Sequence, residues 1–251
     1  DELMIPDLST LKKLPWNKEP TAQVICDLHY ISGAPSAVAP RQVLKKIIQL
    51  LKDNDLRAVV APELEFYLCE KNLDPNIPLQ TPVGKSGRRA NGSDVFGIDS
   101  VNEFDVFLDD IYDYCETLDI GVDTLVHESG PSQIEINLNH GDPLKLADQT
   151  FMFKRAVRQV ALKHGIHATF MAKPHQGQPG SSMHIHQNLV SIKNGNNIFS
   201  DANGKESEKF YNYIGGLQTY LPDAMVFFAP YVNSYRRFVI DASAPINTHW
   251  G

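Results

Sequence analysis

Three stretches of the chain alternate between apolar and polar side chains in the manner of β-strands: residues 57–69, 133–138 and 182–189. Successive side chains of a strand point to opposite faces of its sheet. In each stretch, therefore, one face is mainly apolar and the other carries carboxylate, amide or imidazole groups. The pattern predicts a sheet with an apolar back and a polar front.

The polar faces of these stretches carry groups that bind metal ions. They hold, in chain order, Glu63, Glu65, Glu135, His184 and His186. Two carboxylates about 7 Å apart on one face repel each other unless a positive charge lies over them. A solvated outer face is the commoner fate of one such pair, but here the pattern occurs three times. We therefore expect a metal site on the open face of an antiparallel sheet.

Helical periodicity indicates the layer behind this sheet. Apolar side chains recur at helical spacing in residues 40–54, 103–119 and 142–165. Asp142 is a suitable N-cap for the third helix, with Pro143 at its first position. In the second helix we expect six side chains to be buried: Phe104, Phe107, Leu108, Ile111, Cys115 and Leu118.

The remaining segments complete an α+β fold class. Residues 1–21 are predicted to be extended and loop-like, and residues 73–99 to form a long irregular loop. Further strands are expected at residues 22–28, 121–127 and 167–174, and a further helix at residues 210–221.

Composition excludes some partners. The 251 residues suffice for one large domain or two small ones, and 42% apolar with 21% charged residues is typical of a soluble protein. The net charge of −7 argues against nucleic acid as a partner. No apolar run is long enough to span a membrane. Cys26, Cys69 and Cys115 have no metal-ligand spacing, which favours reduced thiols in a cytoplasmic protein.

The candidate metal ligands form a set dominated by oxygen. It comprises Glu63, Glu65, Glu128, Glu135 and His184. Such a set suits Mg²⁺ or Mn²⁺ better than zinc. Because Mg²⁺ keeps several of its waters, five protein ligands indicate two or more ions, as in sites that act on phosphates. Arg236 and Arg237 offer a clamp for a substrate carboxylate, although a solvated surface turn explains their spacing equally well.

Five segments in the same order resemble motifs of the glutamine synthetase family. They are residues 61–66, 128–135, 173–186, 233–237 and 244–245. The resemblance covers nearly the whole chain. It implies a curved antiparallel sheet with helices packed on its outer face, and the ligation of glutamate to an amine through a γ-glutamyl phosphate. ATP and Mg²⁺ or Mn²⁺ are the implied cofactors, glutamate and a small amine the substrates, and a homo-oligomer of stacked rings the full-length assembly.

The resemblance also assigns roles to individual residues. Glu65, Glu128 and Glu135 would hold the metal nearer the glutamate. Glu63 and His184 would hold the metal nearer the nucleotide. His186 and Asn188 would contact ATP, and Gly180 would contact the bound glutamate. Arg237 would bind the α-carboxylate of glutamate and take part in catalysis.

Two departures from the family pattern concern the amine. Ammonia-using members carry a glutamate where this chain has Ser243, and a tyrosine near the position of Gly92. Losing both favours a larger acceptor, and residues 141–143, 170–174 and 177–180 are similar to the γ-glutamylpolyamine branch. An ammonia-using glutamine synthetase and a non-catalytic metal- or nucleotide-binding relative are the alternatives. A cupin-like barrel fits poorly, because no glutamate follows His186 closely.

We further expect residues 1–251 to be a fragment of the catalytic domain. The family's small N-terminal β-grasp domain has no counterpart in these motifs, and neither do the arginines and the last glutamate ligand that follow in the family. The resemblance therefore predicts that residues 1–251 alone are inactive.

Overall fold

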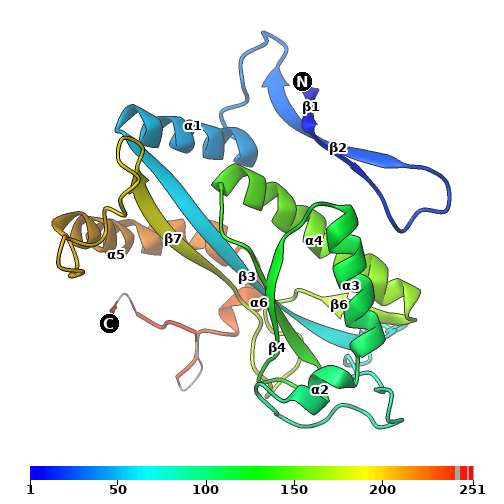
Figure 1. Ribbon diagram of the computed structural model, residues 1–251. Helices are drawn as coiled ribbons and strands as arrows, with labels where there is room; N and C mark the ends of the chain where they lie inside the picture. Colours follow the sequence, from blue (N-terminus) through cyan, green and yellow to red (C-terminus); the bar gives the residue numbers. More distant parts are fainter. Residues whose placement is uncertain (241–243, 248, 251) are drawn as a thin grey trace.

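The computed structural model describes residues 1–240, 244–247, 249 and 250. Its main sheet is antiparallel and is built around the long strand β3 (Figure 1). One edge of β3 pairs with β5, which in turn pairs with β4, while β7 and β6 pair with successive halves of the other edge. The strands are β3 (Leu56–Glu70), β4 (Val122–His127), β5 (Gln133–Leu138), β6 (Ile166–Thr169) and β7 (Met183–Ser191).

Helices α3 (Asp105–Thr117) and α4 (Pro143–Lys163) pack behind this sheet. Their apolar faces meet the apolar faces of β3 and β5 in one core, where Phe66, Ile134 and Phe153 are fully buried. All six side chains predicted to be buried in the second helix are buried. The α+β class, with an antiparallel sheet and helices on its back, is confirmed.

The other helices contribute little to the core. They are α1 (Pro40–Asp53), α2 (Ile98–Asn102), α5 (Glu208–Phe228) and α6 (Val232–Tyr235). Neither α1 nor α5 has a buried residue. The sequence predicted a helix at residues 210–221, and α5 is longer, continuing through Pro222 to Phe228. A proline within a helix removes one backbone donor, but it does not end α5. Within the described residues, none of the helices combines the length and apolar character needed to cross a bilayer.

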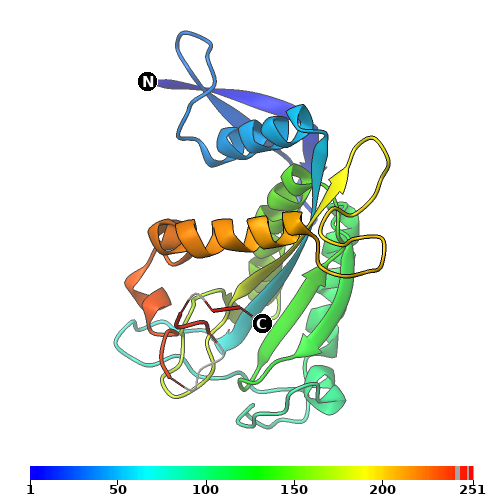
Figure 2. The ribbon, with the colours of Figure 1, turned by 90° about the vertical axis from the view of Figure 1, so that its left-hand side faces the viewer.

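A separate two-stranded sheet consists of β1 (Glu2–Lys13) and β2 (Ala22–Tyr30). It stands at one end of the molecule, beyond α1 (Figure 2). The prediction that residues 1–21 are loop-like is wrong for β1, because pairing with β2 supplies a hydrogen-bond ladder that local sequence does not reveal. Arg41 of α1 ties this hairpin to the body by ion pairs to Asp7, Asp27 and Asp148.

Candidate functional site

The strand register places the predicted ligands on one face of the main sheet. Glu63 lies opposite His184 on the β7 side of β3, and Glu65 lies opposite Glu135 on the β5 side. Directly opposed residues of antiparallel strands point to the same face. The face behind them holds the apolar core, so the acidic groups are on the open side, as the alternation predicted.

Three of the predicted ligands form a compact group. One ligand atom from each of Glu63, Glu135 and His184 lies within 4.8 Å of the other two. The His184 side chain is 61% exposed, whereas that of Glu63 is 23% exposed. The group is therefore reachable from solvent and is backed by the sheet. Glu135 was predicted to bind the metal nearer the glutamate, whereas Glu63 and His184 were predicted to bind the metal nearer the nucleotide. The structure places ligands of both predicted metals side by side.

Uncompensated negative charge surrounds Glu135. Burial raises the pKa of its carboxyl, and the nearby carboxylates of Glu63, Glu128 and Glu65 raise it further. A divalent cation would relieve both the repulsion and the desolvation. Two carboxylates and one imidazole are also donors that Mg²⁺ and Mn²⁺ accept. The residues present therefore fit a metal ion of this kind.

Glu65 is held by the protein itself. It is only 9% exposed and accepts hydrogen bonds from Gln133 Nε2 at 3.0 Å, from the backbone N–H of Ser182 at 3.2 Å, and from the Ser182 hydroxyl. Sequence reasoning gave Gln133 and Ser182 no such role. Their positions in the strands could have indicated this role. Gln133 points to the same face as Glu135, and Ser182 points to the same face as His184.

The other predicted residues occupy three different surroundings. His186 Nε2 lies 2.8 Å from Glu63 Oε1, beside the compact group. The Asn188 side chain accepts a hydrogen bond from Asn197 at 2.9 Å and lines a cavity between β7 and α5. Glu128 follows β4, where its carboxylate accepts from the backbone N–H of Ser129.

Gly180 and Arg237 lie in contact with each other. A Cβ atom at Gly180 would stand 2.6 Å from Arg237 Cγ and 2.8 Å from the carbonyl oxygen of Ala172, so only glycine fits without displacement. Arg237 donates to the Ser181 carbonyl at 2.7 Å, and burial lowers the pKa of its guanidinium. The two residues are thus brought together next to Glu65. Ser243, the position that bears on the acceptor, lies outside the described residues.

The fold is that of a ligase family. The catalytic domain of glutamine synthetase matches residues 37–251, and the chain belongs to that family. The matched region begins after β2, so the β1–β2 hairpin precedes it.

Three curated relatives match the whole chain. It is 38% identical to gamma-glutamylputrescine synthetase PuuA of Escherichia coli, 33% identical to a glutamate–isopropylamine ligase of a Pseudomonas species, and 35% identical to a glutamine synthetase of Methanocaldococcus jannaschii. The chain spans about half the length of these relatives, namely 53%, 54% and 54%.

Solved structures show the same fold. GmaS without ligand superposes with a TM-score of 0.79 at 29% identity, over 94% of this chain and 54% of that one. A glutamine synthase homolog superposes with a TM-score of 0.80 at 20% identity, over 95% of this chain and 53% of that one. The second likeness concerns the fold alone.

Proposed function

We propose that this chain contributes the metal-binding face of an ATP-dependent ligase that joins the γ-carboxylate of glutamate to an amine. The observation that carries the proposal is the group of Glu63, Glu135 and His184, with ligand atoms within 4.8 Å of one another on the open face of the sheet. Family membership supports the reaction class, and a gamma-glutamylputrescine synthetase among the relatives supports a polyamine as the acceptor.

In this proposal Glu63, Glu135 and His184 hold a divalent cation, with Glu65 and Glu128 as further ligands. When bound, Mg²⁺ or Mn²⁺ withdraws charge from phosphate oxygens during phosphoryl transfer. His186 and Asn188 are the proposed nucleotide contacts, and His186 is already positioned by its contact with Glu63.

The substrate side of the proposal rests on Gly180 and Arg237. Gly180 lets the backbone of its loop approach glutamate closely, and Arg237 binds the α-carboxylate in a bidentate manner. Tyr67 donates to the Pro179 carbonyl at 2.9 Å, and Arg237 donates to that of Ser181, so the loop is fastened on both sides of Gly180. A fixed loop positions the γ-carboxylate for transfer.

Two alternatives to a polyamine-using ligase can be distinguished from it. A glutamine synthetase of Methanocaldococcus jannaschii is 35% identical, which supports an ammonia-using enzyme as the second candidate. A non-catalytic metal- or nucleotide-binding relative is the third. The carboxylates around Glu135 argue against a non-catalytic relative that binds no metal, because carboxylates repel one another in the absence of a cation.

The metal site is tested by thermal unfolding during titration with Mn²⁺. We expect stabilisation that rises with concentration, reaching about 2.7 kcal/mol at a hundredfold excess over the dissociation constant. Glu135→Gln should abolish this gain. It should also raise stability without metal at neutral pH, since it removes one of the repelling charges.

Glu116→Gln is the matched control, because Glu116 lies on α3, behind the sheet. It should leave the response to Mn²⁺ unchanged. Equal stabilisation of the wild-type chain and Glu135→Gln by Mn²⁺ would remove the physical basis of the proposal.

A further inference from the structure

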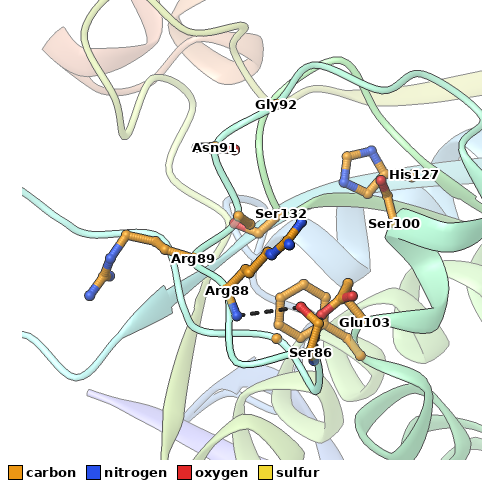
Figure 3. Close-up of a pocket in the computed structure, with 12 residues that line it drawn as sticks. Ser86, Arg88, Arg89, Asn91, Gly92, Ser100, Glu103, His127 and Ser132 are labelled. Atoms are coloured by element: carbon orange, nitrogen blue, oxygen red, sulfur yellow. Dashed lines mark hydrogen bonds between the residues drawn. The ribbon is translucent and has the colours of Figure 1, made fainter.

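The cavity beneath residues 84–92 belongs to a region that the family resemblance already connects with the amine. It encloses about 300 Å³, and Gly92, His127 and Ser132 are among the residues that line it (Figure 3). The resemblance places a tyrosine of the ammonia-using members near Gly92. The acidic face carries a different feature, the hydroxyl of Ser182, which contacts two of the proposed metal ligands.

Two hydrogen bonds of the Ser182 backbone hold this residue beside Glu65. The backbone N–H of Glu65 donates to the Ser182 carbonyl at 3.2 Å, and the backbone N–H of Ser182 donates to Glu65 Oε2, also at 3.2 Å. Neither bond involves the Ser182 side chain. A substitution of that side chain should therefore leave the start of β7 in place.

The Ser182 hydroxyl lies between a carboxylate and an imidazole. It donates to Glu65 Oε1, and its oxygen lies 3.3 Å from His184 Nε2. A hydroxyl has one proton to donate and can accept as well. Because its proton goes to Glu65, Ser182 is the acceptor toward His184. Nε2 of His184 is therefore the nitrogen that carries the proton of this contact.

The other ring nitrogen of His184 faces the acidic group. Nδ1 lies 3.4 Å from Glu63 Oε2, and both residues belong to the group whose ligand atoms lie within 4.8 Å of one another. A neutral imidazole with its proton on Nε2 keeps a lone pair on Nδ1, which is available to a metal ion. The contacts from His184 through Ser182 to Glu65 thus leave Nδ1 to a cation.

We propose that Ser182 is a positioning residue of the metal site, because its hydroxyl links a ligand of one predicted metal to a ligand of the other. Glu65 was predicted to bind the metal nearer the glutamate, and His184 the metal nearer the nucleotide. Histidine ligands are commonly held by a hydrogen bond from the second ring nitrogen, and loss of that partner lowers metal affinity by about 10- to 100-fold. The inference rests on the proposed function, since it requires these residues to bind a cation.

Electron paramagnetic resonance of free Mn²⁺, titrated with the 251-residue chain in the absence of ATP and glutamate, tests the proposal. We expect the dissociation constant of Mn²⁺ to rise by at least about tenfold in Ser182→Ala. Ser182→Thr keeps a hydroxyl, so its affinity should stay close to that of the wild-type chain. Ser200→Ala is the matched control, because Ser200 is an exposed serine between β7 and α5 and should leave the affinity unchanged.

The ring proton of His184 provides a second measurement, made by nuclear magnetic resonance with Mg²⁺, which is diamagnetic. Correlation of the ring nitrogens with their protons should show the proton on Nε2 in the wild-type chain and in Ser182→Thr. In Ser182→Ala this proton loses its acceptor, so its signal should broaden through exchange with water.

The two measurements separate this inference from the proposed function. Equal Mn²⁺ affinity in the wild-type chain and Ser182→Ala, equal losses in Ser182→Ala and Ser182→Thr, or a ring proton on Nδ1 would each overturn the role of Ser182 and leave the proposed function standing. Failure of the wild-type chain to bind Mn²⁺ would instead remove the proposed function and this inference with it.

Discussion

Gln133 joins the acidic face to the loop that carries Gly180. Its side chain is 1% exposed, and Nε2 lies within hydrogen-bond distance of Glu65 Oε2, the Gly180 carbonyl and the Ser181 hydroxyl. Its own oxygen accepts from the backbone N–H of Gly130 at 2.9 Å. One amide thereby fixes the orientation of a carboxylate and the position of a loop.

Replacing this amide by a side chain of similar size should be costly. Gln133→Leu leaves Glu65 with fewer donors and leaves the Gly130 N–H without its acceptor, so we expect a loss of about 1–3 kcal/mol in the free energy of unfolding. Urea denaturation measures it. Gln187→Leu is the control, because Gln187 is exposed and its side chain accepts one hydrogen bond from the described residues, that of Tyr213. Equal losses in the two variants would contradict the role given to Gln133.

At the scale of elements, one arginine of α1 holds three separate segments together. The Arg41 side chain is 13% exposed and meets Asp7 of β1, Asp27 of β2 and Asp148 of α4 at 2.6–3.0 Å. Hydrogen bonds from Ser9 and from Arg41 lower the pKa of Asp7 to about 2. A carboxyl with a lowered pKa stabilises the fold above its ordinary pKa, and this contribution is lost as the pH falls.

Acid should therefore weaken the attachment of the β1–β2 hairpin. At pH 7, Arg41→Gln removes the cation that pairs with Asp7 and Asp148, while Asp27 keeps its ion pair with Lys45, and the substitution should cost about 3–5 kcal/mol. The difference from the wild-type chain should shrink between pH 3.8 and about pH 2, where Asp7 becomes protonated. Unfolding followed by circular dichroism across this range measures both effects. A difference that does not depend on pH, or an equal cost in Arg57→Gln, would argue against the ion-pair attachment.

At the scale of the whole molecule, α5 packs against the face of β7 that is opposite to the acidic face. Tyr213 of α5 donates to Gln187 of β7 at 2.6 Å, and Gln187 alternates with His184 and His186 along this strand, so its side chain points to the other face. Large apolar side chains such as Tyr220 and Phe227 are exposed along α5. Helices α3, α4 and α5 thus lie on the same side of the sheet, and the proposed reaction belongs to the opposite, acidic side.

The amine acceptor has to be tested on a protein of the relatives' full length, because this chain spans about half the length of its curated relatives. With ATP, Mg²⁺ and glutamate, we expect a protein of the relatives' length that carries this sequence to convert putrescine to γ-glutamylputrescine faster than ammonium to glutamine. Mass spectrometry of the products measures this. Glutamine as the main product would favour the ammonia-using alternative.

The same assay tests the expectation that residues 1–251 alone are inactive. We expect little ADP release from this chain with glutamate and putrescine. Robust ADP release would overturn the expectation without affecting the choice of acceptor.

The sequence by itself determined the features that repeat along one strand or one helix. Alternation separated Glu63 and Glu65 from Leu64 and Phe66, and helical spacing identified the buried face of α3, because both periods follow from local backbone geometry. The motif order indicated the family, which the comparisons confirm.

Only the tertiary structure decided which of these groups meet. Pairing between distant strands brings Glu63, Glu135 and His184 together. Glu65 instead accepts hydrogen bonds from Gln133 and Ser182. Strand β1 was missed because its ladder comes from β2, and the cavity beside His127 was missed because loop 84–92 has no periodicity. Contacts between segments far apart in the chain depend on register and packing, and these are properties of the folded molecule.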